Sequence, residues 1–341
     1  MKSIDKEITL ALQLSEKHTD DYSKYSNIYP WTNENLEGTF GAFCKPNSKV
    51  LTCNGSGDHP LNAVLYGSTD ITTFDINQFS LYYLDLKIAA LLSFNREEFL
   101  MFMPGVFDKF EFLLNVYKRN MIHKVFVDSE NLRKVLPILK EQQKIPRERQ
   151  EDLFSSQVFL ENLKNLDERS YDFWTKLYKK RPDITETFLF KTHSCGPKEE
   201  IVFNSNYLRT NKNYQLVKNK LPGVNIRKVV APIKKLPHKI KNEQFDFIHF
   251  SNIANNPHVA FSPIMIPLEL GMIKYSYFIE KHIYKMLKEG GTIVLNRLQE
   301  PNLNLFSSRT DYSMQRAFSE RNLDISILDL ENKERIYYKK I

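Results

Sequence analysis

Short apolar runs alternate with longer helical segments in the first hundred residues. Apolar runs at 48–53 and 70–76 have the length, and the turn residues at their ends, that are typical of strands. A short helical pattern at 59–66, ended by Gly67, lies between them, and a strong helical pattern follows over 77–94. This part of the chain is therefore predicted to form a strand–helix–strand–helix unit.

The same alternation returns towards the C-terminus. Strand patterns at 224–233, 245–253 and 292–298 accompany a long helical pattern at 266–291, and the tail from 323 predicts two strands joined by a turn. Strands that alternate with helices favour a parallel sheet with both faces covered. The predicted fold class is α/β: a Rossmann-like, mostly parallel sheet with an antiparallel C-terminal hairpin.

A charged helical pattern separates these two parts and predicts a large helical insertion. Residues 3–27 also predict a helix, and the aromatic loop behind it is interpreted either as a lid or as a segment packed on the core. The predicted organisation has four parts: an N-terminal helix and lid-like loop at 1–46, the first part of the Rossmann-like domain at 47–95, the insertion at 96–220, and the second part of the domain at 221–341.

The composition is that of an ordinary folded protein. Of the 341 residues, 42% are hydrophobic, which is enough for a sizeable core. The three cysteines, Cys44, Cys53 and Cys195, match no disulfide or zinc spacing, which favours a reducing compartment. Since the N-terminus is charged and no apolar window reaches the length of a membrane span, we expect a cytoplasmic protein without a transmembrane segment.

The charge balance gives only a weak indication of partners. Lys and Arg number 48 against 41 Asp and Glu, a net charge of +7. This excess favours anionic partners and is compatible with peripheral membrane contact, but a merely solubilising surface explains it equally well. No RNA- or DNA-binding motif accompanies it, so nucleic acid is not expected as a partner.

The turn between the first strand and the first short helix indicates a nucleoside site. Gly55 and Gly57 allow a sharp turn and a close approach of the backbone to a ligand. Asp75 follows 18 residues after Gly57, at the end of the second strand, where a carboxylate can accept hydrogen bonds from both ribose hydroxyls.

Asp58 indicates which kind of nucleoside ligand the turn could bind. A dinucleotide site normally carries G-x-G-x-x-G and places a pyrophosphate at the helix N-terminus, where Asp58 would repel it. A ligand with an ammonium or sulfonium group, such as S-adenosyl-L-methionine, suits this position better. The alternative is a structural turn in which Asp58 caps the helix.

Two later motifs support the same donor. A polar tip, Ser251-Asn252-Ile253, follows an apolar strand, and ligands of such sheets lie at the carboxyl ends of strands. The Gly290-Gly291 turn then joins a helix to the next strand. Both segments resemble the fourth- and fifth-strand motifs of class I S-adenosylmethionine-dependent methyltransferases.

A narrower resemblance rests on the first block. The chain has Thr52 after "VL", the turn at 55–58, Asp75 with Asn77, "LKIAA" at 86–90 and "EEF" at 97–99. In these motifs it resembles the S-adenosylmethionine:diacylglycerol 3-amino-3-carboxypropyltransferase family of betaine-lipid synthesis and its uncharacterised relatives. The resemblance covers roughly 47–105 and 200–297, and departs from the family at Gln78, where proline is frequent.

The resemblance implies a transfer reaction with S-adenosyl-L-methionine as a substrate. The 3-amino-3-carboxypropyl group would move to a hydroxyl or amine of a small-molecule or lipid acceptor bound beside the insertion, with release of methylthioadenosine. The first alternative is a methyltransferase. The second is a non-catalytic binding protein on the same fold, motivated by Thr52 and by the lack of an obvious catalytic base.

The candidate site residues follow from these motifs. The residues expected to contact the cofactor are Asn54, Gly55, Ser56, Gly57, Asp58, Asp75, Ile76, Asn77, Ser251 and Asn252. No catalytic base is identified; His59, Tyr207 and Arg209 are the candidates, and each also has an ordinary structural interpretation. Lys87 is expected to form an ion pair or to be solvated. His193 and Cys195 offer two ligands at most, so no metal site is predicted.

Overall fold

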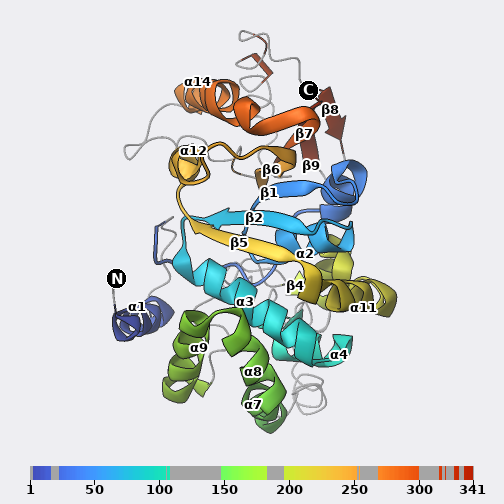
Figure 1. Cartoon of the computed structure of the whole chain (residues 1–341). Helices are drawn as coiled ribbons and strands as arrows, with labels where there is room; N and C mark the ends of the chain where they lie inside the picture. Colours follow the sequence, from blue (N-terminus) through green and yellow to red (C-terminus); the bar gives the residue numbers. More distant parts are fainter. Residues whose placement is uncertain are drawn as a thin grey trace, which may run out of the picture.

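A seven-stranded sheet crosses the computed structural model (Figure 1). The structure describes residues 3–16, 23–104, 106–107, 147–182, 196–251, 253, 268–298, 315–316, 319, 326–329 and 334–340. The order of strands across the sheet is β5 (Asn225–Val230), β2 (Asp70–Asp75), β1 (Lys49–Cys53), β6 (Phe245–His249), β7 (Leu287–Leu298), β9 (Glu334–Lys340) and β8 (Ser326–Asp329).

The directions of the strands confirm the predicted fold class. The neighbours from β5 to β7 pair in parallel, whereas β9 runs antiparallel to both β7 and β8. The first strand, β1, therefore lies inside the sheet, with β2 on one side and β6 on the other. This is a mostly parallel Rossmann-like sheet with an antiparallel C-terminal hairpin.

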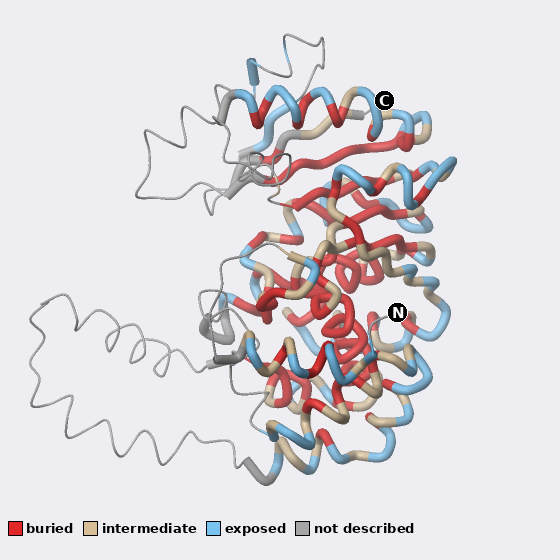
Figure 2. Tube along the Cα trace, turned by 90° about the vertical axis from the view of Figure 1, so that its left-hand side faces the viewer, coloured by how far each residue is buried: buried red, intermediate tan, exposed pale blue. Residues whose placement is uncertain are grey.

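Both faces of the sheet are buried. Successive side chains of a strand point to opposite faces, so each strand contributes to two hydrophobic clusters. Val50 of β1 and Phe247 of β6 are paired and belong to one hydrophobic cluster, whereas their neighbours Leu51 and Ile248, also paired, belong to the other. Figure 2 shows the buried residues concentrated along the strands and the helices packed on them. The near-continuous apolar runs of the sequence follow from this double burial.

Helices cover the sheet on both sides. The described helices are α1 (Ile4–Glu16), α2 (Asp58–Leu65), α3 (Gln78–Ser93), α4 (Arg96–Phe102), α7 (Arg147–Ser155), α8 (Gln157–Leu166), α9 (Glu168–Lys180), α10 (Lys198–Asn204), α11 (Asn211–Lys220), α12 (Leu236–Lys239) and α14 (Leu268–Phe278). A short parallel pair, β3 (Val106–Phe107) and β4 (Gly196–Pro197), lies apart from the sheet. None of the helices in the described ranges is long and apolar enough to cross a membrane.

Helix α3 is buried on all sides because it lies between the sheet and the described helices of the predicted insertion. In Figure 1, β2 and β5 lie on one side of it and α8 and α9 on the other. Phe159 of α8 and Trp174 of α9 belong to the same hydrophobic cluster as Val50 of β1. The Asn77 side chain caps α3 by accepting a hydrogen bond from the Phe79 backbone N–H at 3.1 Å. The proposed division into four parts remains a prediction.

Two predicted elements differ from the structure. The first helix is predicted to reach residue 27, yet the described part of α1 covers Ile4–Glu16 and 23–27 is irregular, because the Ser26 and Lys24 carbonyl oxygens accept hydrogen bonds at the start of α3. The long helix near the C-terminus ends earlier than predicted, and β7 already begins at Leu287. The Gly290-Gly291 pair lies within β7, where the pairing with β6 shifts register.

The aromatic loop is packed on the core, as one of its two interpretations proposed. Trp31, Leu36 and Phe40 are at most 1% exposed, and a π-helical turn covers Glu37–Gly41.

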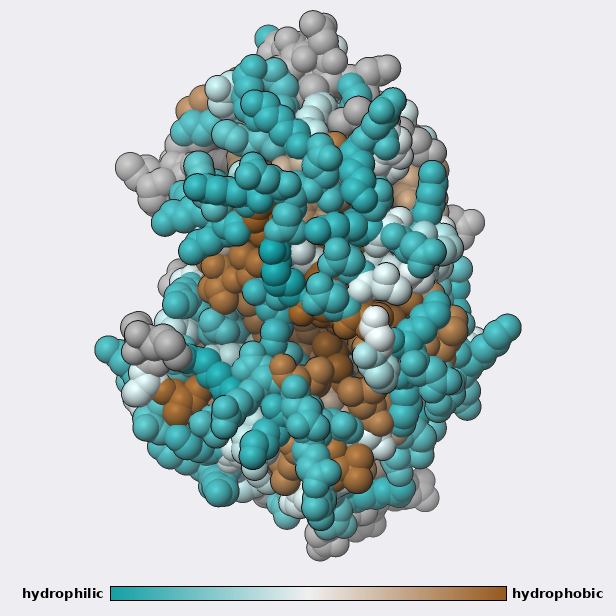
Figure 3. Space-filling view, viewed as in Figure 1, coloured by the Kyte–Doolittle hydropathy of each residue, from teal (hydrophilic) through white to brown (hydrophobic). Residues whose placement is uncertain are grey.

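The molecular surface is mostly hydrophilic on the face shown in Figure 3, with smaller apolar areas between the polar side chains.

Candidate functional site

The strand order reverses between β1 and β6, and this is where open α/β sheets bind their ligands. The connection from β1 leads to β2 on one side, whereas β6 pairs with β1 on the other. Helices leave the two strands in opposite directions at such a point, which opens a crevice at their carboxyl ends. Cys53 ends β1 and His249 ends β6, so the residues that follow them form the candidate site.

The glycine turn is held against α3. Gly57 has a φ of 83°, in the left-handed region, and a Cβ added there would lie 3.3 Å from the Leu84 Cα. Asn54 donates to the Ser80 carbonyl at 2.9 Å and to its hydroxyl at 2.8 Å, and that hydroxyl donates to the Gly55 carbonyl at 2.5 Å. Asn54 and Gly57 are thus held in place within the protein, and the turn has a defined shape.

Asp58 is the acceptor of a closed, buried network, which we call the Asp58 network. Its carboxylate accepts hydrogen bonds from four donors: the Lys87 ammonium at 2.6 Å, the Ser56 hydroxyl at 2.6 Å, the Thr32 backbone N–H at 2.8 Å and the Tyr207 hydroxyl at 3.0 Å. The cation beside Asp58 is therefore an ammonium of this chain.

Lys87 itself is fully buried and forms the expected ion pair. Its ammonium lies 4.1 Å from the centre of the Trp31 ring and 5.0 Å from that of Tyr83, within cation–π range. Burial lowers the pKa of Lys87 to about 8, although Asp58 opposes this effect. Burial raises the pKa of Tyr207 well above its ordinary value, and the charge of Asp58 adds to this.

Asp75 lies at the carboxyl end of β2 and remains partly exposed. Its Oδ1 accepts a hydrogen bond from the Asn77 backbone N–H at 2.8 Å. Burial raises the pKa of Asp75 to about 6, while hydrogen bonds from Asn77, Ser80 and Ile76 oppose the shift. Ile76 is also partly exposed, whereas Asn77 is buried as the cap of α3.

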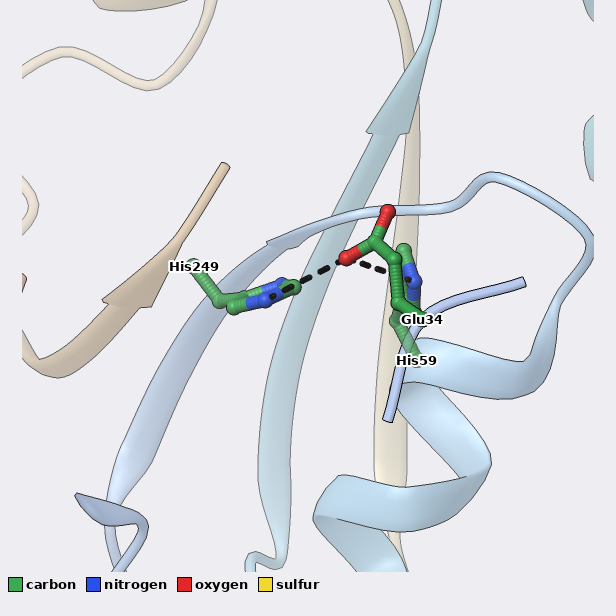
Figure 4. Close-up of side chains that lie close together, drawn as sticks. All are labelled: Glu34, His59 and His249. Carbon is green, nitrogen blue, oxygen red and sulfur yellow. Dashed lines mark ion pairs between the residues drawn. The ribbon is translucent and has the colours of Figure 1, made fainter. Parts of the chain in front are cut away.

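A second buried polar group, the Glu34 cluster, joins Glu34, His59 and His249 (Figure 4). The Glu34 Oε2 atom lies 3.8 Å from the Nε2 atom of each histidine. Glu34 also accepts hydrogen bonds from the Ser251 hydroxyl and, at 3.0 Å, from the Asn296 side chain. The cluster lies at the carboxyl ends of β1 and β6, so the candidate residues His59 and Ser251 meet at the crevice.

The partners of the two Nδ1 atoms fix how both histidine rings face the Glu34 carboxylate. The Nδ1 atom of His59 lies 3.0 Å from the Cys53 carbonyl oxygen, which can only accept, so Nδ1 carries the proton of the neutral ring. The Nδ1 atom of His249 lies 3.5 Å from the Thr52 hydroxyl. Burial lowers the pKa of His249 well below its ordinary value, and His59 lowers it further. His249 is therefore neutral, and the Nε2 atom of each ring faces Glu34.

Of the other candidate residues, Arg209 lies outside the Asp58 network and the Glu34 cluster. Arg209 is partly exposed; its guanidinium pairs with Glu37 and lies 5.3 Å from the centre of the Phe203 ring. Ser251 has a φ of 53° at the tip of β6. Asn252, His193 and Cys195 lie outside the described residues.

Sequence reasoning missed two members of the Glu34 cluster. Glu34 lies in an irregular aromatic loop, where no periodicity marks it. His249 had a signal: it is a histidine in an otherwise apolar run, just before the polar tip at Ser251. The predicted site includes this tip and not the histidine.

Comparison with known proteins gives similarities to solved structures and none to a known family. No known protein family and no curated protein matches the chain. Among solved structures, it is similar to SMU.776, a proposed methyltransferase in complex with SAH, with 9% identity and a TM-score of 0.36 over 90% of this chain and 48% of the other. It is also similar to a proposed SAM-dependent methyltransferase from Streptococcus mutans, with 9% identity and a TM-score of 0.34 over 90% and 46%. The chain spans about half the length of these two structures.

Proposed function

We propose that the chain is an S-adenosylmethionine-dependent transferase that moves the 3-amino-3-carboxypropyl group to a hydroxyl or amine of a small-molecule or lipid acceptor. The observation that carries the proposal is the placement of Asp75. Its partly exposed carboxylate ends β2, next to the glycine turn that ends β1 and beside the reversal of strand order. A nucleoside ribose binds at this place in open α/β sheets.

The donor is assigned from the residues around Asp75. Ile76 is partly exposed next to it and would border the adenine. Gly55 is partly exposed with a φ of 52°, so it would present backbone without a side chain to the crevice, whereas Gly57 fixes the turn against α3. Because Asp58 already pairs with Lys87, we assign Asp58 the role of fixing this turn and not that of binding the sulfonium.

The choice of transferred group rests on the sequence motifs. Thr52, Asp75 with Asn77 and the "LKIAA" helix resemble the aminocarboxypropyl transferases. In that reaction the acceptor oxygen or nitrogen attacks the γ-carbon of the methionine chain and loses its proton. The bond between this carbon and sulfur breaks, and sulfur keeps the electron pair in methylthioadenosine. Attack on the methyl carbon would instead leave S-adenosylhomocysteine, and orientation in the site decides between the two.

Binding and product analysis test the proposal separately. Calorimetry with S-adenosylmethionine, methylthioadenosine and S-adenosylhomocysteine should show binding that Asp75→Asn weakens at least tenfold. Asp70→Asn is the matched control, because it makes the same change at the other end of β2. A folded wild-type protein that binds none of the three compounds would contradict the donor assignment and favour the non-catalytic alternative.

Product analysis decides which group moves. Incubation with S-adenosylmethionine and panels of diacylglycerols, small alcohols and amines should release methylthioadenosine, detected by mass spectrometry. Asp75→Asn should reduce the release and Asp70→Asn should not. If S-adenosylhomocysteine is the only nucleoside product, the protein is a methyltransferase and the aminocarboxypropyl assignment is wrong.

A further inference from the structure

The Glu34 cluster brings three metal-ligating groups together from three distant segments. Glu34 comes from the aromatic loop, His59 from the first turn of α2 and His249 from the end of β6. They are exposed by 2%, 1% and 0%, respectively. A carboxylate with so little access to water needs compensation, which hydrogen bonds, a proton or a cation can provide.

We propose that Glu34, His59 and His249 bind a divalent transition-metal ion, with zinc as the first candidate. This site does not depend on the proposed transfer reaction. The three ligand atoms lie within 4.8 Å of one another, and Glu34 Oε2 lies 3.8 Å from each Nε2 atom. Since zinc bonds to nitrogen and oxygen are about 2.0–2.2 Å long, two ligands of one ion lie at most about 4.4 Å apart. Both carboxylate–imidazole pairs satisfy this limit.

The surroundings of the histidines have the arrangement found around bound metals. Imidazole ligands usually give their other N–H to a carbonyl or a similar acceptor, which fixes the ring and directs the free lone pair to the ion. His59 Nδ1 meets the Cys53 carbonyl at 3.0 Å, and His249 Nδ1 meets the Thr52 hydroxyl at 3.5 Å. Thr52 of β1, one of the residues that carry the family resemblance, therefore contacts this cluster.

An independent observation comes from His249. Its Nε2 atom is buried and has no hydrogen-bond partner within the part of the chain that the structure describes. This nitrogen points towards Glu34 Oε2, as does that of His59 (Figure 4). A proton shared between Glu34 and His59 would leave the His249 nitrogen unsatisfied, whereas one cation satisfies the carboxylate and both nitrogens.

The chemistry of the ligands selects the class of ion. Imidazole nitrogens suit zinc, iron, nickel and copper, whereas magnesium and calcium prefer oxygen ligands. Two histidines and one carboxylate leave at least one position open, as in zinc and non-haem iron enzymes. The Thr32 hydroxyl lies 3.4 Å from His59 Nε2, beside such a position.

Metal analysis tests the site without any assay of activity. The full chain, freed of any histidine tag, is stripped with a chelator, incubated with zinc sulfate and desalted. Elemental analysis should give about one zinc per chain. Cobalt(II) should bind with the intense visible absorption of a low-symmetry site, and zinc should displace it and raise the thermal midpoint.

Matched variants locate the ion. His249→Ala and Glu34→Gln should lose stoichiometric zinc, the cobalt absorption and the rise in thermal midpoint. His238→Ala is the control, since His238 is exposed on α12, and it should behave as wild type. If His249→Ala does not fold, as judged by circular dichroism, His59→Gln tests the same ligand set. A folded wild type that retains no zinc and shows no cobalt absorption overturns the proposal, as does a folded Glu34→Gln variant that binds like wild type.

Discussion

Asp58 and His59 are neighbours in the sequence, but they belong to two buried polar groups that differ in how their members are hydrogen-bonded. The Asp58 carboxylate accepts four hydrogen bonds and pairs with a buried ammonium. In the Glu34 cluster, which contains His59, a carboxylate faces two imidazoles and the Nε2 atom of His249 has no hydrogen-bond partner in the described chain. The Asp58 carboxylate is thus compensated within the protein, whereas the unsatisfied nitrogen of His249 is explained by the metal ion that we propose there.

The largest effect on stability is expected from removing the cation of the Asp58 network. Lys87→Met removes the ammonium and leaves a fully buried carboxylate without its counter-ion. We expect a loss of about 3–5 kcal/mol in the free energy of unfolding, measured with urea, because an uncompensated charge stays in the core.

The double variant sharpens this test. Asp58→Asn combined with Lys87→Met removes both charges and should recover more than half of the loss. Tyr207→Phe, which removes one hydrogen bond to the same carboxylate, should cost only about 1–2 kcal/mol. A loss below about 1 kcal/mol in Lys87→Met would mean that the network is not needed for stability.

An intermediate effect is expected at Asp75, which has fewer protein partners than Asp58. Its pKa is about 6 in the folded protein and near 3.8 in the unfolded chain, so the folded state favours the protonated acid. This contribution to stability is present below pH 3.8 and is lost as the pH rises through 6. At pH 8, Asp75→Asn should therefore stabilise the free protein, by about 1–2 kcal/mol because the partly exposed side chain keeps part of its hydration.

The measurement is a series of urea unfolding curves between pH 4 and pH 8. The difference between Asp75→Asn and wild type should be near zero at the acid end and grow with pH. Ligand binding should change in the opposite sense, since ionised Asp75 is the better acceptor for ribose hydroxyls. A variant that is destabilised at pH 8 would show that Asp75 is a structural residue like Asp58.

The smallest effect on the metal-free protein is expected from Glu34→Gln. The amide keeps one oxygen to accept from Asn296 or Ser251, and its NH₂ can donate to the unsatisfied Nε2 atom of His249. We expect a change within about 1 kcal/mol in the free energy of unfolding without metal. A loss as large as that of Lys87→Met would remove the distinction between the two groups.

Local sequence patterns predicted the elements of the sheet, but not the partners of its polar residues. β1, β2 and α3 lie where the pattern placed them, because apolar runs and turn residues act over a few positions. Asp58 was interpreted as a residue that prefers a cationic ligand, and its cation is Lys87 from one turn of α3. No short window contains both residues, so only the packing of α3 on the glycine turn could reveal the pair.

The end of the first helix was misjudged for the same reason. The predicted helix includes residues 23–27, but the Ser26 carbonyl there accepts a hydrogen bond from the Asn77 side chain at the start of α3. The Glu34 cluster could not be predicted from local patterns either, because its residues come together only when β1 pairs with β6. A buried histidine among apolar residues was the one local sign of it.

The hydrogen bonds of Glu34 also bear on the order in which the molecule assembles. Glu34 is joined to Ser251 across 217 residues of chain and to Asn296 across 262. Contacts so distant in sequence close slowly, and a growing chain cannot make them until residues 251 and 296 have been synthesised. β1 and β2 can pair early, but the loop that carries Glu34 finds its partners only after β6 and β7 have joined the sheet. A chain stopped before residue 245 would therefore contain most of the motifs that suggest the nucleoside site, yet lack the strand that completes the crevice.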